Sequence, residues 1–136
     1  LNSNQGKVMN ATNLIQGPVI EVMITLDANQ EPKVTYLQEG EVCTGNVVVT
    51  CGEDITYRLV NSAGYAFMGA GFLTPYDNII DSVQVSADGQ ELVLVDEDNV
   101  AGTTKFQLIF TNTTNSLLLL SPDPQVINKD IKPPKY

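Results

Sequence analysis

Short segments of alternating apolar and polar residues recur along the chain. Residues 82–86 alternate strictly, and residues 33–37 and 105–110 alternate nearly as well. A period of two places successive side chains on opposite faces of a β-strand. Residues 19–26 are more continuously apolar, which indicates a strand buried mostly on both faces. Nowhere do apolar residues recur at helical spacing for three turns, so the pattern predicts an all-β chain.

Turn-forming residues separate these segments. Asp27 to Pro32 combines Asp, Asn and Pro, and Asp88-Gly89 is a strong hairpin signal. About eight or nine short strands at intervals of roughly 8–12 residues predict a β-sandwich with immunoglobulin-like, Greek-key wiring. The Cys…Trp…Cys hallmark of antibody domains is missing, because the chain has no tryptophan. Further strand candidates are residues 47–49, 55–60, 65–72, 92–95, 117–120 and 126–127.

The same pattern predicts the organisation of the chain and its core. Residues 1–16, rich in Asn, Ser, Gln and Gly, are expected to form an extended arm, residues 17–128 a single sandwich domain, and residues 129–136 a basic, proline-rich tail. The apolar faces of the strands should supply the core. The predicted core positions are Val22, Ile24, Leu26, Ile55, Tyr57, Leu59, Phe67, Val83, Val85, Leu92, Leu94, Phe106, Leu108 and Phe110.

Composition supports one globular domain and restricts its partners. The 136 residues are 43% apolar, enough for a real core. No apolar run approaches the ~20 residues of a membrane-spanning helix. Sixteen acids against seven bases give a net charge of −9, and residues 39–98 carry eleven of the acids with Arg58 as their single base. Such a surface disfavours nucleic acid and anionic lipid, and suits cations, basic partners or simple solubility.

The absence of histidine removes several kinds of chemistry. Ser-His and Cys-His nucleophile pairs and imidazole metal sites are all excluded. Asp77 and Asp81 are the best remaining carboxylate pair, but nothing in their surroundings predicts the raised pKa that a general acid needs. We therefore expect no catalytic residues, and a protein that is not an enzyme.

The acidic segment Asp96-Glu97-Asp98-Asn99 has two interpretations. Asp and Asn hydrogen-bond their own backbone in turns, and Gly102 would complete such a corner. An EF-hand loop is excluded, since Val100 and Gln107 stand where oxygen ligands are required. A weak calcium site at the end of a sheet needs no such motif, so Asp96, Asp98 and Asn99 are the candidate metal ligands; no other cofactor is expected.

Two further features leave alternatives open. Cys43 and Cys51 are the only cysteines, and a disulfide between them would close a small loop. If a hairpin turned at Thr44-Gly45, however, Cys51 would pair nearer Glu39 than Cys43.

The stretch YAFMGAGFLTPY, residues 65–76, places two glycines among aromatic residues. It is typical of a bulged core strand, and alternatively of a small apolar pocket in which a ligand approaches the backbone.

Several stretches carry a family resemblance. Glu31-Pro32 follows the first strand and Asp123-Pro124 the last, and GFLTPYDNIIDSV and VAGTTKFQLIFTNTTNSLLLLSPDPQVIN lie between and around them. The chain resembles the bacterial DP-EP family over residues 19–128. More distantly, it is similar in kind to the acidic, histidine-poor inclusion-body (AidA/PixA) proteins. Neither resemblance implies an assigned activity or supplies catalytic residues.

The expected function is therefore structural. We predict a non-catalytic β-sandwich that self-assembles or binds another macromolecule, through strand addition by its terminal arms, as a homo-oligomer or filament. The alternative is calcium-dependent binding of a ligand or carbohydrate at the acidic loops. Leu1 in place of Met leaves two locations open: the cell surface or outside if a leader was removed, and the cytoplasm otherwise.

Overall fold

The computed structural model describes residues 15–122 and 124–129. Within these residues the chain forms eleven strands and no helix, and so no helix that could cross a membrane. The strands are β1 (Ile15–Leu26), β2 (Pro32–Gln38), β3 (Glu41–Cys43), β4 (Val47–Val49), β5 (Glu53–Leu59), β6 (Tyr65–Phe72), β7 (Ser82–Val85), β8 (Glu91–Asp96), β9 (Gly102–Asn112), β10 (Leu118–Leu120) and β11 (Gln125–Asn128).

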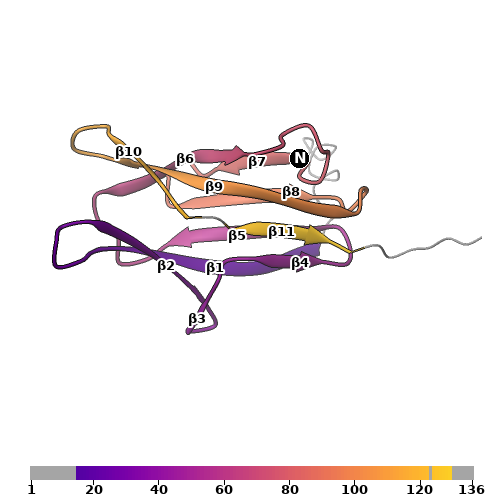
Figure 1. Ribbon diagram of the computed structural model, residues 1–136, viewed down its shortest axis with the longest axis horizontal. Coiled ribbons are helices and arrows are strands. Elements are labelled where there is room, and N and C mark those ends of the chain that lie inside the picture. The colour runs from indigo at the N-terminus through magenta and orange to yellow at the C-terminus, as the bar shows by residue number, and fades with distance from the viewer. Residues whose placement is uncertain (1–14, 123, 130–136) are drawn as a thin grey trace, which may run out of the picture.

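The strands form two facing sheets (Figure 1). The first has the order β3-β2-β1-β5-β8-β7. The second is built on β9, which pairs with β6 along one edge and with β10 and β11 along the other, and β4 lies beyond β11. Two pairings, β1 with β5 and β11 with β4, are parallel. The all-β sandwich is confirmed, whereas immunoglobulin-like Greek-key wiring stays a prediction.

Both sheets contribute to one core. All predicted core positions are buried except Leu26 and Val85, which are 54% and 38% exposed, and Val83, which is only partly buried. Both exposed residues lie at strand ends: Leu26 is the last residue of β1, and Val85 is the last residue of the edge strand β7. Alternation did not identify six further buried positions: Ile20, Tyr36, Val47, Val49, Ile79 and Val126.

Tyr57 lies at the centre of this core. Its side chain is fully buried, and its hydroxyl donates a 2.6 Å hydrogen bond to the carbonyl of Gly45. Its ring makes edge-on contacts with Tyr36 and Phe106, at centroid separations of 6.4 and 6.1 Å. Burial raises the pKa of Tyr57 far above its ordinary value, so the phenol is neutral and holds its hydrogen bond as a donor.

The segment from Thr44 to Asn46 joins the two sheets. It leaves β3 in the first sheet and enters β4 in the second. The hairpin at Thr44-Gly45 that the sequence suggested for this segment is therefore absent. Cys43 and Cys51 are both free thiols here, the first half-buried and the second exposed. Strand β3 itself was not predicted, because three residues with two exposed side chains carry no readable alternation.

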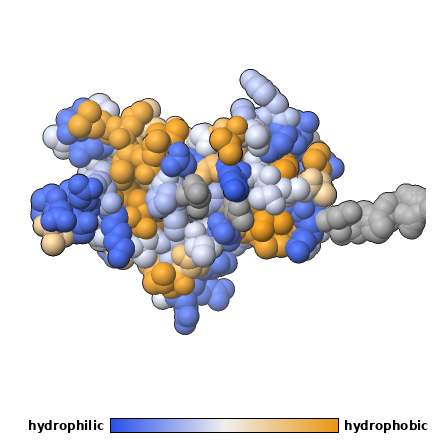
Figure 2. Space-filling model, viewed as in Figure 1, coloured by the Kyte–Doolittle hydropathy of each residue, from blue (hydrophilic) through white to orange (hydrophobic). Residues whose placement is uncertain are grey.

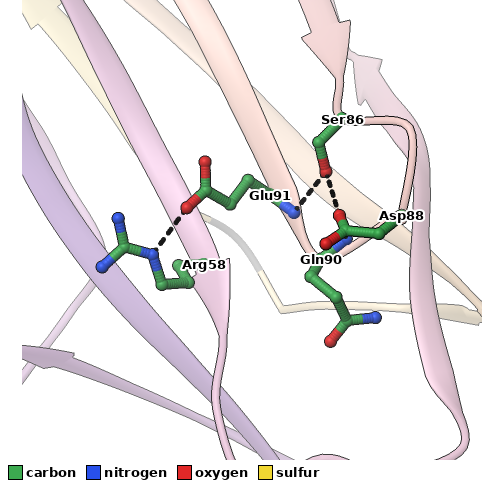
Figure 3. Close-up of polar contacts among 5 residues, drawn as sticks. All are labelled: Arg58, Ser86, Asp88, Gln90 and Glu91. Atoms are coloured by element: carbon green, nitrogen blue, oxygen red, sulfur yellow. Dashed lines mark hydrogen bonds and ion pairs between the residues drawn. The ribbon is translucent and has the colours of Figure 1, made fainter.

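The predicted hairpin at Asp88-Gly89 is present between β7 and β8 (Figure 3). The Ser86 hydroxyl donates to the Asp88 carboxylate at 2.6 Å, and the backbone N–H of Gln90 donates to the same oxygen at 3.0 Å. Ser86 Oγ in turn accepts the N–H of Glu91 at 3.0 Å. These hydrogen bonds hold the pKa of Asp88 below its usual range, with the Ser86 hydroxyl the largest cause.

The same hairpin ties neighbouring strands together. Arg58 on β5 and Glu91 on β8 are register partners, and their side chains form an ion pair at 2.7 Å (Figure 3). The carbonyl of Gly89 accepts the N–H of Phe67 at 2.7 Å, which joins the hairpin tip to β6 of the other sheet. The turn is thus a bridge between the two layers.

Candidate functional site

A groove opens on the outer face of the second sheet, where β6, β9 and β10 lie side by side. It encloses about 550 Å³, a size typical of small-molecule and side-chain binding cavities. Three strands and the residue after β6 contribute to it. The lining residues are Gly71, Phe72, Leu73, Lys105, Phe106, Gln107, Ile109 and Leu120.

The register of β6 on β9 explains why a groove forms. Gly69 and Gly71 are paired with Ile109 and Gln107, positions that face away from the core. Because glycine has no side chain, the outer surface of Ile109 is left uncovered. A Cβ added at Gly71 would stand 3.6 Å from Ile109 Cδ1, which is an ordinary van der Waals contact. The backbone would therefore accept a Cβ at this position, and the hollow exists because the residue is glycine.

Both interpretations of the stretch from Tyr65 to Tyr76 hold, each for a different part: the first part is a bulged core strand, and the later part lines an apolar groove. The predicted bulge is present, as a register shift between Phe67 and Gly69. Phe67 is buried core, whereas Gly71, Phe72 and Leu73 line the groove. Sequence reasoning identified this segment, but it missed Lys105, Gln107 and Leu120 opposite.

Large apolar side chains surround the groove without being covered. Leu73 is 76% exposed, Leu118 59% and Leu120 52%, and Met68 at the bulge is 58% exposed. Figure 2 shows hydrophobic residues gathered over β10 and the adjoining parts of β6 and β9. Contiguous exposed apolar surface of this kind marks interaction sites in folded proteins.

The groove is also free of acids. Lys105 is the single charged residue among those that line it, although the chain carries sixteen carboxylates. Gln107 is turned to the side, where its amide donates to the carbonyl of Ser121 at 2.7 Å. The surface is therefore an apolar, locally basic area on a strongly acidic molecule.

A tight turn follows the groove directly. The hydroxyl of Thr74 donates to the carboxylate of Asp77 at 2.7 Å, and the N–H of Ile79 donates to the other oxygen at 3.0 Å. Burial is the largest single effect and raises the pKa of Asp77, but the hydrogen bonds from the Ile79 N–H and from the side chains of Thr104 and Thr74 together outweigh it, so the pKa of Asp77 is lowered. Tyr76, between them, is 92% exposed.

Asp77 and Asp81, the carboxylate pair considered from sequence, each hold a separate loop. Asp77 is committed to its own turn, and its lowered pKa is the opposite of what a general acid requires. Asp81 accepts the backbone N–H of Glu97 at 2.7 Å, so it supports a different loop. Each carboxylate has a structural partner.

The acidic corner after β8 is held by one buried carboxylate. Asp96 is fully buried; its Oδ1 accepts the N–H of Asp98 at 2.8 Å and the side-chain amide of Asn128 at 3.2 Å. Asn128 Nδ2 also donates to the carbonyl of Val100 at 2.8 Å. Burial, supported by the charges of Asp98 and Asp81, raises the pKa of Asp96 to about 6. The corner thus links β8 of one sheet to β11 of the other.

The candidate metal ligands Asp96 and Asn99 both take part in hydrogen bonds within the acidic corner. Within residues 15–122 and 124–129, no three Asp, Glu, Cys or His side chains lie so that they could hold a metal ion. Asn99 is exposed, and its amide donates to Glu97 at 3.2 Å. Asn128, the actual partner of Asp96, was missed, because no local pattern connects residues 32 positions apart.

The two dipeptides singled out in the sequence flank strands. Asp27 Oδ1 accepts the N–H groups of Asn29 and Glu31, and Pro32 then opens β2, where proline is tolerated at the first position of a strand. Pro124 is buried, and its carbonyl accepts the N–H of Phe106 at 3.2 Å. Asp123 lies outside the described residues.

A search of curated proteins gave no match. Residues 18–130 match the sequence profile of the DP-EP family, which covers most of the chain. The chain therefore belongs to the DP-EP family.

Proposed function

We propose that this protein is a non-catalytic β-sandwich that works by self-assembly, and that copies associate through the apolar outer face of the second sheet. The observation that carries the proposal is the set of exposed leucines, Leu73, Leu118 and Leu120, around a groove without carboxylates. Burying apolar surface contributes about 25 cal/mol per Å², so this face gives association a driving force.

Charge favours the same face. Two copies that each carry −9 repel one another wherever acidic surfaces meet. The groove presents Lys105 and no acid, so contact there adds the least repulsion. A self-associating acidic protein needs such an area, because desolvated like charges cost several kcal/mol.

Strand addition is the second contact that we propose. The first sheet ends in β3 and β7, edge strands whose outer backbone groups are available for pairing. The predicted arms, of which residues 1–14 and 130–136 lie outside the described part of the chain, would supply the added strand. An arm bound to a neighbouring copy would extend the assembly from one molecule to the next.

Sedimentation velocity across a wide concentration range tests the proposal. The wild-type protein should self-associate, and Leu118→Asp should weaken association by at least about tenfold, since it places a charge in the apolar face. Leu26→Asp is the matched control, because Leu26 is 54% exposed at the end of the inner strand β1, away from the groove and from both edge strands of the first sheet. A strictly monomeric wild-type protein at millimolar concentration would sink the proposal.

A second candidate function is calcium-dependent binding of a ligand or carbohydrate at the acidic loops. Asp96 Oδ2 and Asn128 Oδ1 favour it, because both are buried acceptor oxygens with no hydrogen-bond donor. A ligand that binds only the folded state raises Tm. Millimolar calcium, compared with chelator, should then raise Tm, and an unchanged Tm removes this candidate.

A further inference from the structure

We propose that Tyr76 is the anchor of the assembly, and that the Tyr76 side chain of one copy occupies the groove of a second copy, whose own Tyr76 returns the contact. The inference rests on the proposed self-assembly and names the residues that make it specific. Three features of the turn and the groove support it.

The turn holds Tyr76 in a fixed position. Thr74 and Asp77 are joined through both side chain and backbone, since the N–H of Asp77 donates to the carbonyl of Thr74 at 3.2 Å and the Thr74 hydroxyl donates to Asp77 at 2.7 Å. Pro75 restricts its own φ. The N–H of Ile79, whose side chain is buried in the core, anchors the far end of the turn on Asp77. The backbone on both sides of Tyr76 is therefore ordered before any partner arrives.

Tyr76 is almost fully exposed to solvent in the monomer. At 92% it is the most exposed of the large apolar side chains in the described residues. Tyrosine combines a large contact area with few rotatable bonds, so ordering it on binding costs little entropy. Rigid, exposed aromatic residues beside an apolar pocket are the usual anchors of interfaces.

The groove complements this turn in size and charge. Its volume of about 550 Å³ admits an aromatic side chain, and Phe72, Ile109 and Leu120 provide apolar walls. Asp77 follows Tyr76 in the turn, and its lowered pKa means that its carboxylate is ionised. Lys105, the one charged residue of the groove, is the complementary partner for it.

Leu73 gives the contact its symmetry. It is both a wall of the groove and the residue immediately before the turn, so the turn that carries Tyr76 begins at the rim of the groove. When a surface carries both halves of a contact side by side, a two-fold axis satisfies both copies at once. The second copy of this chain is therefore the occupant that fits.

Sedimentation velocity with four variants tests the inference. Tyr76→Ala should raise the dissociation constant by about 10- to 100-fold, and Tyr76→Phe should retain most of the association. Gly71→Val should weaken association similarly, because its side chain fills the groove floor and its Cβ would meet Ile109 Cδ1 at an ordinary contact distance. Leu26→Ala, at the end of the inner strand β1, should leave association unchanged. Thermal unfolding of each variant shows that the monomer is intact.

A mixing experiment tests the reciprocal geometry. Tyr76→Ala keeps an intact groove, and Gly71→Val keeps an intact tyrosine. In an equimolar mixture, the Tyr76 side chain of a Gly71→Val copy can therefore enter the groove of a Tyr76→Ala copy, which restores one of the two contacts. The mixture should associate more tightly than either variant alone. If Tyr76→Ala associates like wild type while Leu118→Asp does not, the tyrosine assignment is wrong and the self-assembly proposal stands. If the wild type is monomeric throughout, both fail.

Discussion

Asp96 shows how a single residue connects the fold to pH. A fully buried carboxylate binds its proton more tightly than an exposed one, and the neighbouring charges of Asp98 and Asp81 add to the effect of burial. Glu53, the register partner of Asp96 on β5, has a pKa raised by burial and by Asp98. The folded state therefore binds more protons than the unfolded chain in mildly acidic solution.

A group with a raised pKa stabilises the folded state at low pH. The Asp96 contribution is full below the unfolded pKa of about 4 and is lost as pH rises through about 6. Asp96→Asn should remove up to about 3 kcal/mol of this pH dependence, because an amide keeps the shape without the charge. Urea unfolding between pH 4 and 7.5 measures it.

Asp88→Asn is the control for this titration. Asp88 is exposed at a hairpin turn and its pKa is lowered, so its contribution has the opposite sign. The variant should leave the loss of stability between pH 4 and 7 in place. If Asp96→Asn keeps the wild-type slope, the buried carboxylate does not titrate in this range.

At the scale of elements, alternation identified most strands and their inward faces. Alternation could not show which inward-facing residues at strand ends stay exposed, such as Leu26 and Val85, because their exposure depends on how the two sheets pack. Ile79, buried within an irregular segment, has no periodic signal at all. A local pattern indicates on which face of a strand a residue lies. Whether that residue is buried depends on the packing of strands that are distant in the sequence.

The hairpin between β7 and β8 depends on a close approach at Gly89. Its φ is 72°, and an added Cβ would stand 2.8 Å from the Cβ of Ala66 on β6. Gly64 has a similar φ of 91° but open space around it. Gly64→Ala should cost about 1 kcal/mol of unfolding free energy from backbone strain, and Gly89→Ala clearly more, since it also displaces β6.

Urea unfolding of the two alanine variants makes this comparison. Equal losses of stability would mean that the contact with Ala66 relaxes freely and that the hairpin tip is not held against β6.

At the scale of the whole molecule, the groove could not be predicted from sequence. Its walls come from β6, β9 and β10, and only the pairing of Leu120 with Ile109 brings the last of these into place. The sequence stretch around Gly71 suggested a pocket, but nothing local indicated what stands opposite. The acidic corner, which the sequence did indicate as a candidate site, also links the two sheets through Asp96 and Asn128, a contact that no local pattern could predict.

The sandwich should fold without its arms. All eleven strands of the described residues lie between Ile15 and Asn128, and the Lys129 N–H donates to the carbonyl of Val49 as the last described contact. A chain of residues 15–129 should therefore unfold cooperatively, with the far-ultraviolet circular dichroism of a β protein. Comparing its sedimentation with that of the full chain separates strand addition by the arms, which it would lose, from association through the groove, which it would keep.

The position of β11 has a kinetic consequence. This strand lies between β9 and β4, and it joins β4 in parallel across almost eighty residues of chain. Until it arrives, β4 has no strand beside it, and the carboxylate of Asp96 lacks its amide partner. Such long closures are slow, on the order of milliseconds to seconds. On the ribosome, the second layer therefore stays open until synthesis has passed Asn128.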